Sequence, residues 1–178
     1  MSLQEEDFQH VEITTPMIQY CNKIKDRLDM NRTKESSIDT EVGIMGELVF
    51  AQWMYGDYMR GNTLSEIRDN FGQVDFDGRY EIKASAHKFS WKLHLPVRQD
   101  YAEKRKPLYY IQVLFDTDKP VISVYTNAMI IGYCSSAMAL DREPETMGRV
   151  TSFKCYLTPF SDLLPMSDFR ELEGGYNG

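Results

Sequence analysis

The chain has 178 residues, and 20 Lys and Arg against 27 Asp and Glu give it a formal net charge of -7. This length suits a single domain, and the 42% hydrophobic content excludes wholesale disorder. The acidic balance argues against a protein that coats nucleic acid by charge alone, although a local basic patch can still bind it. No apolar run approaches the roughly 20 residues of a membrane-spanning helix, so we expect no membrane partner.

The N-terminus and the cysteines indicate the cellular compartment. Residues 1–8 are acidic and polar, which is unlike a secretory signal. The cysteines are odd in number, widely spaced and without a CxxC pair, so buried reduced thiols are favoured over a zinc site: Cys21, Cys134 and Cys155. We therefore expect a cytoplasmic protein, or one of the host cytoplasm if its source is a virus.

Two helices are predicted in the first third of the chain, after a loosely held lead-in over residues 1–13. Thr15 and Pro16 are typical of a helix start, and the apolar residues that follow predict an amphipathic helix over 16–30. Over residues 40–55, apolar side chains cover nearly the whole helical circumference. A helix of this kind belongs in the interior of a protein.

The interior helix has two unusual features. Gly43 and Gly46 are places where another element could approach the helix backbone closely. Glu47 puts a carboxylate among apolar side chains, and an uncompensated buried carboxylate costs several kcal/mol or becomes neutral. We therefore expect a partner for Glu47, which is either a Lys or Arg side chain or a metal ion.

The middle of the chain predicts a sheet. Val74 and Phe76 precede a Gly-centred turn at 77–79, and Tyr80 and Ile82 follow it, which indicates a β-hairpin. Other expected elements are strands near 89–95, 108–115 and 121–126, helical turns near 135–140 and 160–164, and a tail at 173–178. The predicted fold class is α/β, a single domain with a central mixed β-sheet flanked by helices.

The hairpin would bring charged side chains to one face. With a three-residue loop, Asp75 lies opposite Glu81, and Lys83 follows on the same face. Two carboxylates directly across a strand pair repel each other unless a cation lies between them. Lys83 is one such cation and a divalent metal ion is another, since oxygen ligands suit Mg²⁺ or Mn²⁺. Glu47 is expected to join this polar cluster between helix and sheet.

The run from Asp75 through Glu81 and Ile82 to Lys83 resembles the D…(D/E)-x-K signature of the PD-(D/E)XK nuclease superfamily. The segment GIMGELVF, residues 43–50, resembles the first core helix of that superfamily, which often supplies an extra acid. The resemblance covers about residues 40–126 and implies a restriction-endonuclease-like fold for one domain over residues 1–178. Val74 stands where the motif commonly has proline.

The resemblance also implies roles for these residues. Asp75 and Glu81 would bind Mg²⁺ or Mn²⁺ together with the backbone carbonyl of Ile82, and Glu47 would bind the metal directly or through water. Lys83 would activate the attacking water and stabilise negative charge on the phosphate. In-line hydrolysis of a phosphodiester needs these contributions. The implied function is that of a metal-dependent nuclease, with DNA as the expected substrate.

A basic segment follows the motif. From Lys83 to Lys106 there are seven Lys and Arg residues against two acids, with aromatic residues between them. Cations pair with phosphates and aromatic rings stack on bases, so this segment is expected to bind nucleic acid. The expected contacts are Ser85, His87, Lys88, Lys92, Arg98, Lys104, Arg105 and Lys106. Gln112 either faces the same cleft or is a satisfied glutamine within the sheet.

Two alternatives remain open at the level of sequence. The chain could be a non-catalytic nucleic-acid-binding or assembly module that keeps the nuclease fold, or an unrelated α+β interaction protein in which the motif is accidental. No Gly-rich phosphate loop of Walker or Rossmann spacing occurs, which argues against an ATP-driven motor. Cleavage of both DNA strands by so small a chain would require a homodimer or a larger complex.

Overall fold

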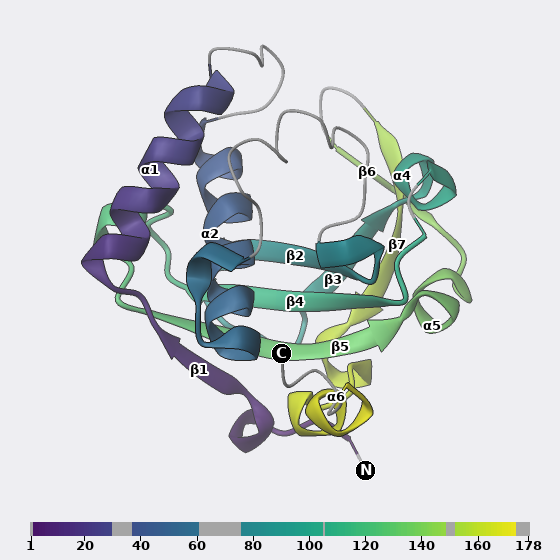
Figure 1. Ribbon diagram of the computed structural model, residues 1–178. Coiled ribbons are helices and arrows are strands. Elements are labelled where there is room, and N and C mark those ends of the chain that lie inside the picture. The colour runs from purple at the N-terminus through teal and green to yellow at the C-terminus, as the bar shows by residue number, and fades with distance from the viewer. Residues whose placement is uncertain (1, 30–36, 61–75, 105, 149–151, 174–178) are drawn as a thin grey trace.

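A four-stranded mixed sheet forms the centre of the structure, with helices on one face and a smaller sheet on the other (Figure 1). The computed structural model describes residues 2–29, 37–60, 76–104, 106–148 and 152–173. The expectation of an α/β fold with a mixed sheet flanked by helices is confirmed.

The central sheet has the strand order β1-β5-β4-β2. Its strands are β1 (Gln9–Glu12), β2 (Tyr80–His87), β4 (Tyr109–Asp116) and β5 (Asn127–Ser135). β2 and β4 are parallel, whereas β5 is antiparallel to both β4 and β1. Among the described strands, β2 therefore lies at one edge of this sheet and β1 at the other.

The smaller sheet has the order β3-β7-β6, and all its strands are antiparallel. They are β3 (His94–Arg98), β6 (Glu145–Met147) and β7 (Phe153–Pro159). β3 and helix α4 (Gln99–Lys104) form the connection that lets β2 and β4 run parallel, since parallel strands cannot be joined by a tight turn. Helix α5 (Ser136–Leu140) follows β5 directly.

Three further helices are α1 (Thr15–Asp29), α2 (Ser37–Tyr55) and α6 (Met166–Leu172). The two helices predicted at 16–30 and 40–55 are thus confirmed, and α2 begins a few residues earlier than expected. Short 3-10 segments are η1 (Glu5–Asp7), η2 (Tyr58–Arg60), η3 (Phe76–Gly78), η4 (Ile122–Val124) and η5 (Phe160–Asp162).

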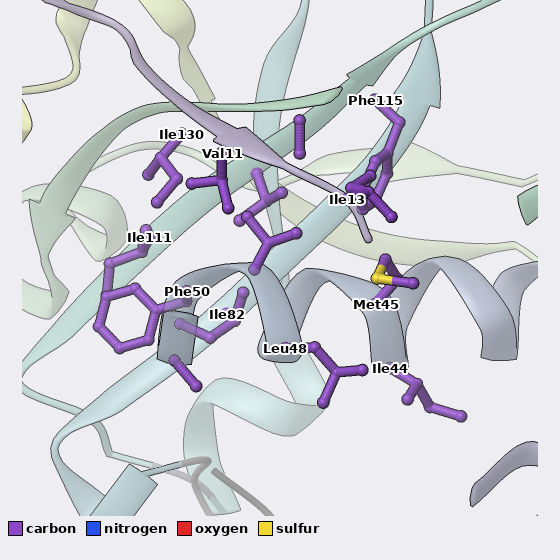
Figure 2. Packing of buried hydrophobic residues seen from close by; sticks show 14 of the residues in the cluster. Val11, Ile13, Ile44, Met45, Leu48, Phe50, Ile82, Ile111, Phe115 and Ile130 are labelled. Atoms are coloured by element: carbon purple, nitrogen blue, oxygen red, sulfur yellow. The ribbon is translucent and has the colours of Figure 1, made fainter. Parts of the chain in front are cut away.

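Two apolar clusters occupy the two faces of the central sheet. The helix-side cluster joins α1, α2 and α6 to one sheet face, and Figure 2 shows Phe50 of α2 beside Ile82 and Ile111, with Met45 of the same helix below Ile13 and Phe115. The inter-sheet cluster lies between the central sheet and the smaller sheet, and includes Leu95, Val97, Tyr110, Leu114 and Phe160. Because successive side chains of a strand point to opposite faces of the sheet, alternate residues of each strand enter one cluster or the other.

The close approach expected at Gly46 is present. A Cβ atom built on Gly46 would lie 2.5 Å from the Cβ atom of Ala84, whereas one built on Gly43 would meet nothing within 4 Å. The backbone of α2 therefore lies directly on β2 at this point. This contact sets the height of the helix over the edge strand.

The expected β-hairpin is wrong at Phe76. This residue begins η3 and has a φ of 37°. The Arg79 N–H donates to the Phe76 carbonyl at 3.0 Å. Among the described strands, the partner of β2 is β4. The Phe76 ring packs edge-on against Phe50 of α2, with ring centres 5.0 Å apart, so burial against the helix overrides the strand pattern. Val74 and Asp75 lie outside the described residues.

Four other expectations are corrected. Residues 122–124 form η4 rather than a strand, because Ile122 and Tyr125 are buried three residues apart, as in a helical turn. The lead-in is part of the core, since β1 pairs with β5 and Phe8 is buried. The expected tail begins with a buried residue, Glu173, while residues 174–178 lie outside the described part. The strand expected at 89–95 forms later, as β3.

The cysteines and the described helices can also be compared with the sequence predictions. Cys21, Cys134 and Cys155 are all buried and form no disulfide, as expected. Among the described helices, none is both long enough and apolar enough to cross a membrane.

Candidate functional site

Strand alternation turns Glu81 and Lys83 to the face of the central sheet that is opposite α2. Their neighbours Tyr80 and Ile82 belong to the helix-side cluster, and Glu81 pairs in register with Tyr110 of the inter-sheet cluster. The Lys83 Nζ atom lies 3.2 Å from the Glu81 Oε1 atom. The sequence prediction that Glu81 and Lys83 share one face is therefore confirmed.

The Glu81 carboxylate is almost completely removed from water. Its side chain is 5% exposed, whereas that of Lys83 is 21% exposed. A buried carboxylate is costly without a nearby positive charge, and Lys83 supplies one at hydrogen-bond distance. Burial raises the pKa of Cys155 in β7 of the smaller sheet, and the positive charges of Arg98 and then Lys83 oppose that rise.

Ser85 and Gln112 extend the polar face along the sheet. The Gln112 Nε2 atom donates to the Ser85 Oγ atom at 2.9 Å and to the Val113 carbonyl at 2.8 Å. Gln112 is fully buried, and its Oε1 atom has no hydrogen-bond donor within the described part of the chain. Gln112 pairs in register with Lys83, so both side chains leave the sheet on the same face.

Glu47 approaches β2 from the other side. It follows Gly46, which contacts Ala84, the residue after Lys83. The α2 backbone at Glu47 therefore lies close to β2 near Lys83. However, α2 covers one face of the sheet, and the Lys83 side chain leaves the sheet on the other face. Glu47 is half-buried, and its charge acts on the Cys21 thiol of α1.

The expected metal ligands are only partly described. Asp75 lies outside the described residues, and the Ile82 carbonyl lies between Glu81 and Lys83 on β2. The expectation that Glu47 joins Glu81 and Lys83 between helix and sheet is wrong, because strand alternation turns Glu81 and Lys83 to the face that α2 does not cover. Among the residues that the structure describes, no group of three His, Cys, Asp or Glu side chains could hold a metal ion. The described part thus supplies one buried carboxylate and its cation.

The basic residues are divided between the two ends of β2. His87, Lys88 and Lys92 are exposed at and beyond its C-terminal end. Lys104 and Lys106 are exposed near its N-terminal end, since Leu108 donates to the Arg79 carbonyl there. An eight-residue strand separates its ends by about 23 Å. The two groups therefore flank Glu81 and Lys83 rather than forming one patch.

Arg98 is less available than the sequence suggests. Its guanidinium binds Asp100 at 3.0 and 2.8 Å and lies over the rings of Tyr101 and Phe153. This pairing lowers the pKa of Asp100, because the hydrogen bonds from Arg98 stabilise the charged carboxylate. Arg105 lies outside the described residues.

The local role of Gln112 goes beyond what the sequence alone indicates. The strand segment YYIQVLF has one polar side chain among apolar ones, and this is the signal that marks position 112. The sequence left open whether Gln112 is satisfied or faces the site. In the structure its amide nitrogen is satisfied, its oxygen is not, and it contacts Ser85, an expected site residue.

Comparison with known proteins adds no identification. The chain matches no family model, and it shows no significant similarity to a curated protein or to a solved structure.

Proposed function

We propose that this chain is a metal-dependent nuclease that hydrolyses phosphodiester bonds, with DNA as the expected substrate, and that its fold is restriction-endonuclease-like. The observation that carries the proposal is the buried Glu81 carboxylate held 3.2 Å from the Lys83 ammonium on an edge strand. An acid and a cation two residues apart are among the groups that metal-assisted phosphodiester hydrolysis requires.

The donor set fits a hard divalent cation. Glu81 and the Ile82 carbonyl offer oxygen atoms, which Mg²⁺ and Mn²⁺ prefer, and Asp75 and Glu47 would have to add their carboxylates to complete the set. A bound cation of this kind polarises the phosphate and lowers the pKa of a bound water. Lys83 places its positive charge next to the same carboxylate, where negative charge develops on the phosphate oxygens.

Ser85 is the expected phosphate contact nearest to this pair. Its oxygen accepts the hydrogen bond from Gln112, which leaves the hydroxyl hydrogen available to a phosphate oxygen. His87 and Lys88 continue in the same direction along the chain and are exposed. A nucleic-acid strand could therefore follow β2 from Lys83 toward its C-terminal end.

The direct test is cleavage of plasmid DNA, single-stranded DNA and RNA with Mg²⁺, with Mn²⁺ and with chelator. We expect the parent to cleave only with metal, and Glu81→Ala and Lys83→Ala to lose at least about a hundredfold in rate. Exposed controls of the same charge are Glu12→Ala and Lys119→Ala, which should retain the parent rate. A parent without activity on any substrate, or Glu81→Ala with full activity, would reject the proposal.

A second candidate is a nucleic-acid-binding module without catalysis. It is favoured by the exposed basic groups at the two ends of β2, which could bind phosphates without a metal. In that case DNA binding would be the same with and without chelator and unaffected by Lys83→Ala. Binding that depends on Mn²⁺, together with a Mn²⁺-induced rise in Tm, would favour the nuclease.

A further inference from the structure

The amide of Gln112 has one orientation that the surrounding groups allow. Both Nε2 hydrogens are used, one by the Val113 carbonyl and one by Ser85. If the amide were reversed, its oxygen would lie 2.8 Å from the Val113 carbonyl oxygen, and two acceptors at that distance repel each other. The Oε1 atom is therefore the one that lacks a partner in the described part of the chain.

A fully buried amide oxygen without a donor is rare in folded proteins. Gln112 has no exposed surface, so water does not compensate in this arrangement. The residue also lies where β5 carries a bulge, at the register shift between Gln112 and Val113. The bulge explains why an amide is needed to bind the Val113 carbonyl, but it does not explain the unused oxygen.

Lys83 is the neighbouring donor. It pairs in register with Gln112, and neighbouring strands lie about 4.8 Å apart, which is within the reach of a lysine side chain. An ammonium group has three N–H donors, and the contact with Glu81 uses one of them. Lys83 can therefore exchange one acceptor for the other by rotation of its own side chain.

We propose that Gln112 is a positioning residue, whose Oε1 atom receives the Lys83 ammonium when the Glu81 carboxylate binds a divalent cation. This inference rests on the proposed function, because it needs a cation at Glu81. A cation competes with Lys83 for the same carboxylate oxygens. Gln112, held in place by Val113 and Ser85, keeps Lys83 beside the site after that exchange.

The first test measures Mn²⁺ affinity by calorimetry in a double-mutant cycle of Gln112→Met and Lys83→Met. We expect Gln112→Met to weaken Mn²⁺ binding about tenfold when Lys83 is present, because the displaced ammonium then has no second acceptor. In the Lys83→Met background the same substitution should change nothing. Equal effects in both backgrounds, or no effect in either, would overturn the proposal.

Ser85→Ala is the matched control for this cycle. It removes one hydrogen bond to the Gln112 amide but leaves the Val113 bond and the Oε1 atom in place. Mn²⁺ affinity should therefore fall much less than with Gln112→Met. If Ser85→Ala weakens Mn²⁺ binding as much as Gln112→Met does, the effect comes from loosened packing and the proposal fails.

The second test needs no metal. Glu81→Ala removes the competing carboxylate, so Lys83 should turn to Gln112 and the two residues should become coupled. In the Glu81→Ala protein, Gln112→Met should lower Tm by a few degrees more when Lys83 is present than when it is replaced in Lys83→Met. In the protein that keeps Glu81, the Tm loss from Gln112→Met should be nearly the same with Lys83 and with Lys83→Met. No coupling in the Glu81→Ala background would reject the proposal.

The two tests separate the inference from the proposed function. If the parent binds no Mn²⁺, the proposed metal site is wrong. The exchange of Lys83 between Glu81 and Gln112 is then wrong as well, even if Lys83 and Gln112 are coupled in the Glu81→Ala protein. Mn²⁺ binding without any coupling rejects Gln112 alone. Should Gln112→Met fail to fold, Gln112→Asn keeps the amide and shortens its reach by one methylene.

Discussion

On β2, Ile82 and Ala84 face helix α2, whereas Glu81 and Lys83 face the smaller sheet. The first face is closed so tightly that position 46 has no room for a methyl group. The second face keeps a buried ion pair and a buried amide oxygen without a donor. Adjacent residues of one strand thus pack against a helix on one side and carry polar groups on the other, and this difference can be tested.

The largest effect is expected from Phe50→Ala on the helix side. Phe50 is fully buried, and its ring meets Phe76, Tyr80 and Phe169 at 5.0, 5.7 and 6.1 Å between ring centres. The substitution should lower the free energy of unfolding by about 3–5 kcal/mol, because it leaves a cavity among rigid rings. Urea denaturation measures it, and a loss below about 1 kcal/mol would contradict this account of the helix-side cluster.

The next effect distinguishes two glycines of α2 that differ only in surroundings. Gly46→Ala should destabilise the protein by about 1–3 kcal/mol, because its Cβ atom would meet that of Ala84 at 2.5 Å. Gly43→Ala, which meets nothing within 4 Å, should stabilise it by about 0.5–1 kcal/mol through helix propensity. The pair is compared in the same urea titrations.

Compensation at Ala84 sharpens the Gly46 prediction. Gly46→Ala combined with Ala84→Gly should recover part of the loss, since it removes the atom that clashes. If the double variant is as unstable as the sum of the two single variants, the contact between α2 and β2 is not as close as the geometry indicates.

A smaller effect is expected from Gln112→Met on the other face. Gln112 is as fully buried as Phe50, but methionine has a similar shape and removes the unsatisfied oxygen together with two hydrogen bonds. The free energy of unfolding should therefore change by no more than about 1 kcal/mol. A loss above about 2 kcal/mol in urea denaturation would mean that Gln112 holds the fold rather than the site.

The helix-side face was predictable because its signals are local. The apolar circumference of residues 40–55 and the alternation around Tyr80 and Ile82 follow from chain geometry alone, and so does the facing of Glu81 and Lys83. The partner of β2 was not predictable in this way. β2 pairs with β4, which is almost thirty residues later in the chain, whereas the hairpin pattern favoured the adjacent segment ending at Phe76.

The errors share a physical cause. Residues 121–126 have strand-like composition, but Ile122 and Tyr125 gain more by packing inward from one turn, where Tyr125 stacks on Phe115 at 4.7 Å. The lead-in is ordered because β1 pairs with β5, more than 100 residues later, and because Phe8 packs against Phe89 and Trp91. The contact of Gln112 with Ser85 depends on the pairing of β2 with β4, two strands far apart in the chain, and no local pattern indicates that.

The smallest effect concerns pH and compares one thiol from each apolar cluster. Burial raises the pKa of Cys21 in the helix-side cluster to about 12, with the carboxylates of Glu41 and Glu47 adding to it and Lys25 opposing it. Burial raises the pKa of Cys134 in the inter-sheet cluster to about 11. In the unfolded chain both thiols ionise near about 8.5.

Above that pH the unfolded state binds fewer protons than the folded state, so the free energy of unfolding should fall between about pH 9 and pH 11. Cys21→Ala and Cys134→Ala should each remove a similar part of this alkaline loss, because at about pH 10 both thiols are still protonated in the folded protein and largely ionised in the unfolded chain. Urea denaturation at about pH 7 and about pH 10 compares the two variants with the parent. The buried tyrosines, whose pKa values are also raised, keep some loss in every variant. A variant that keeps the whole alkaline loss of the parent would mean that the thiol it lacks is not shielded from water in the folded protein.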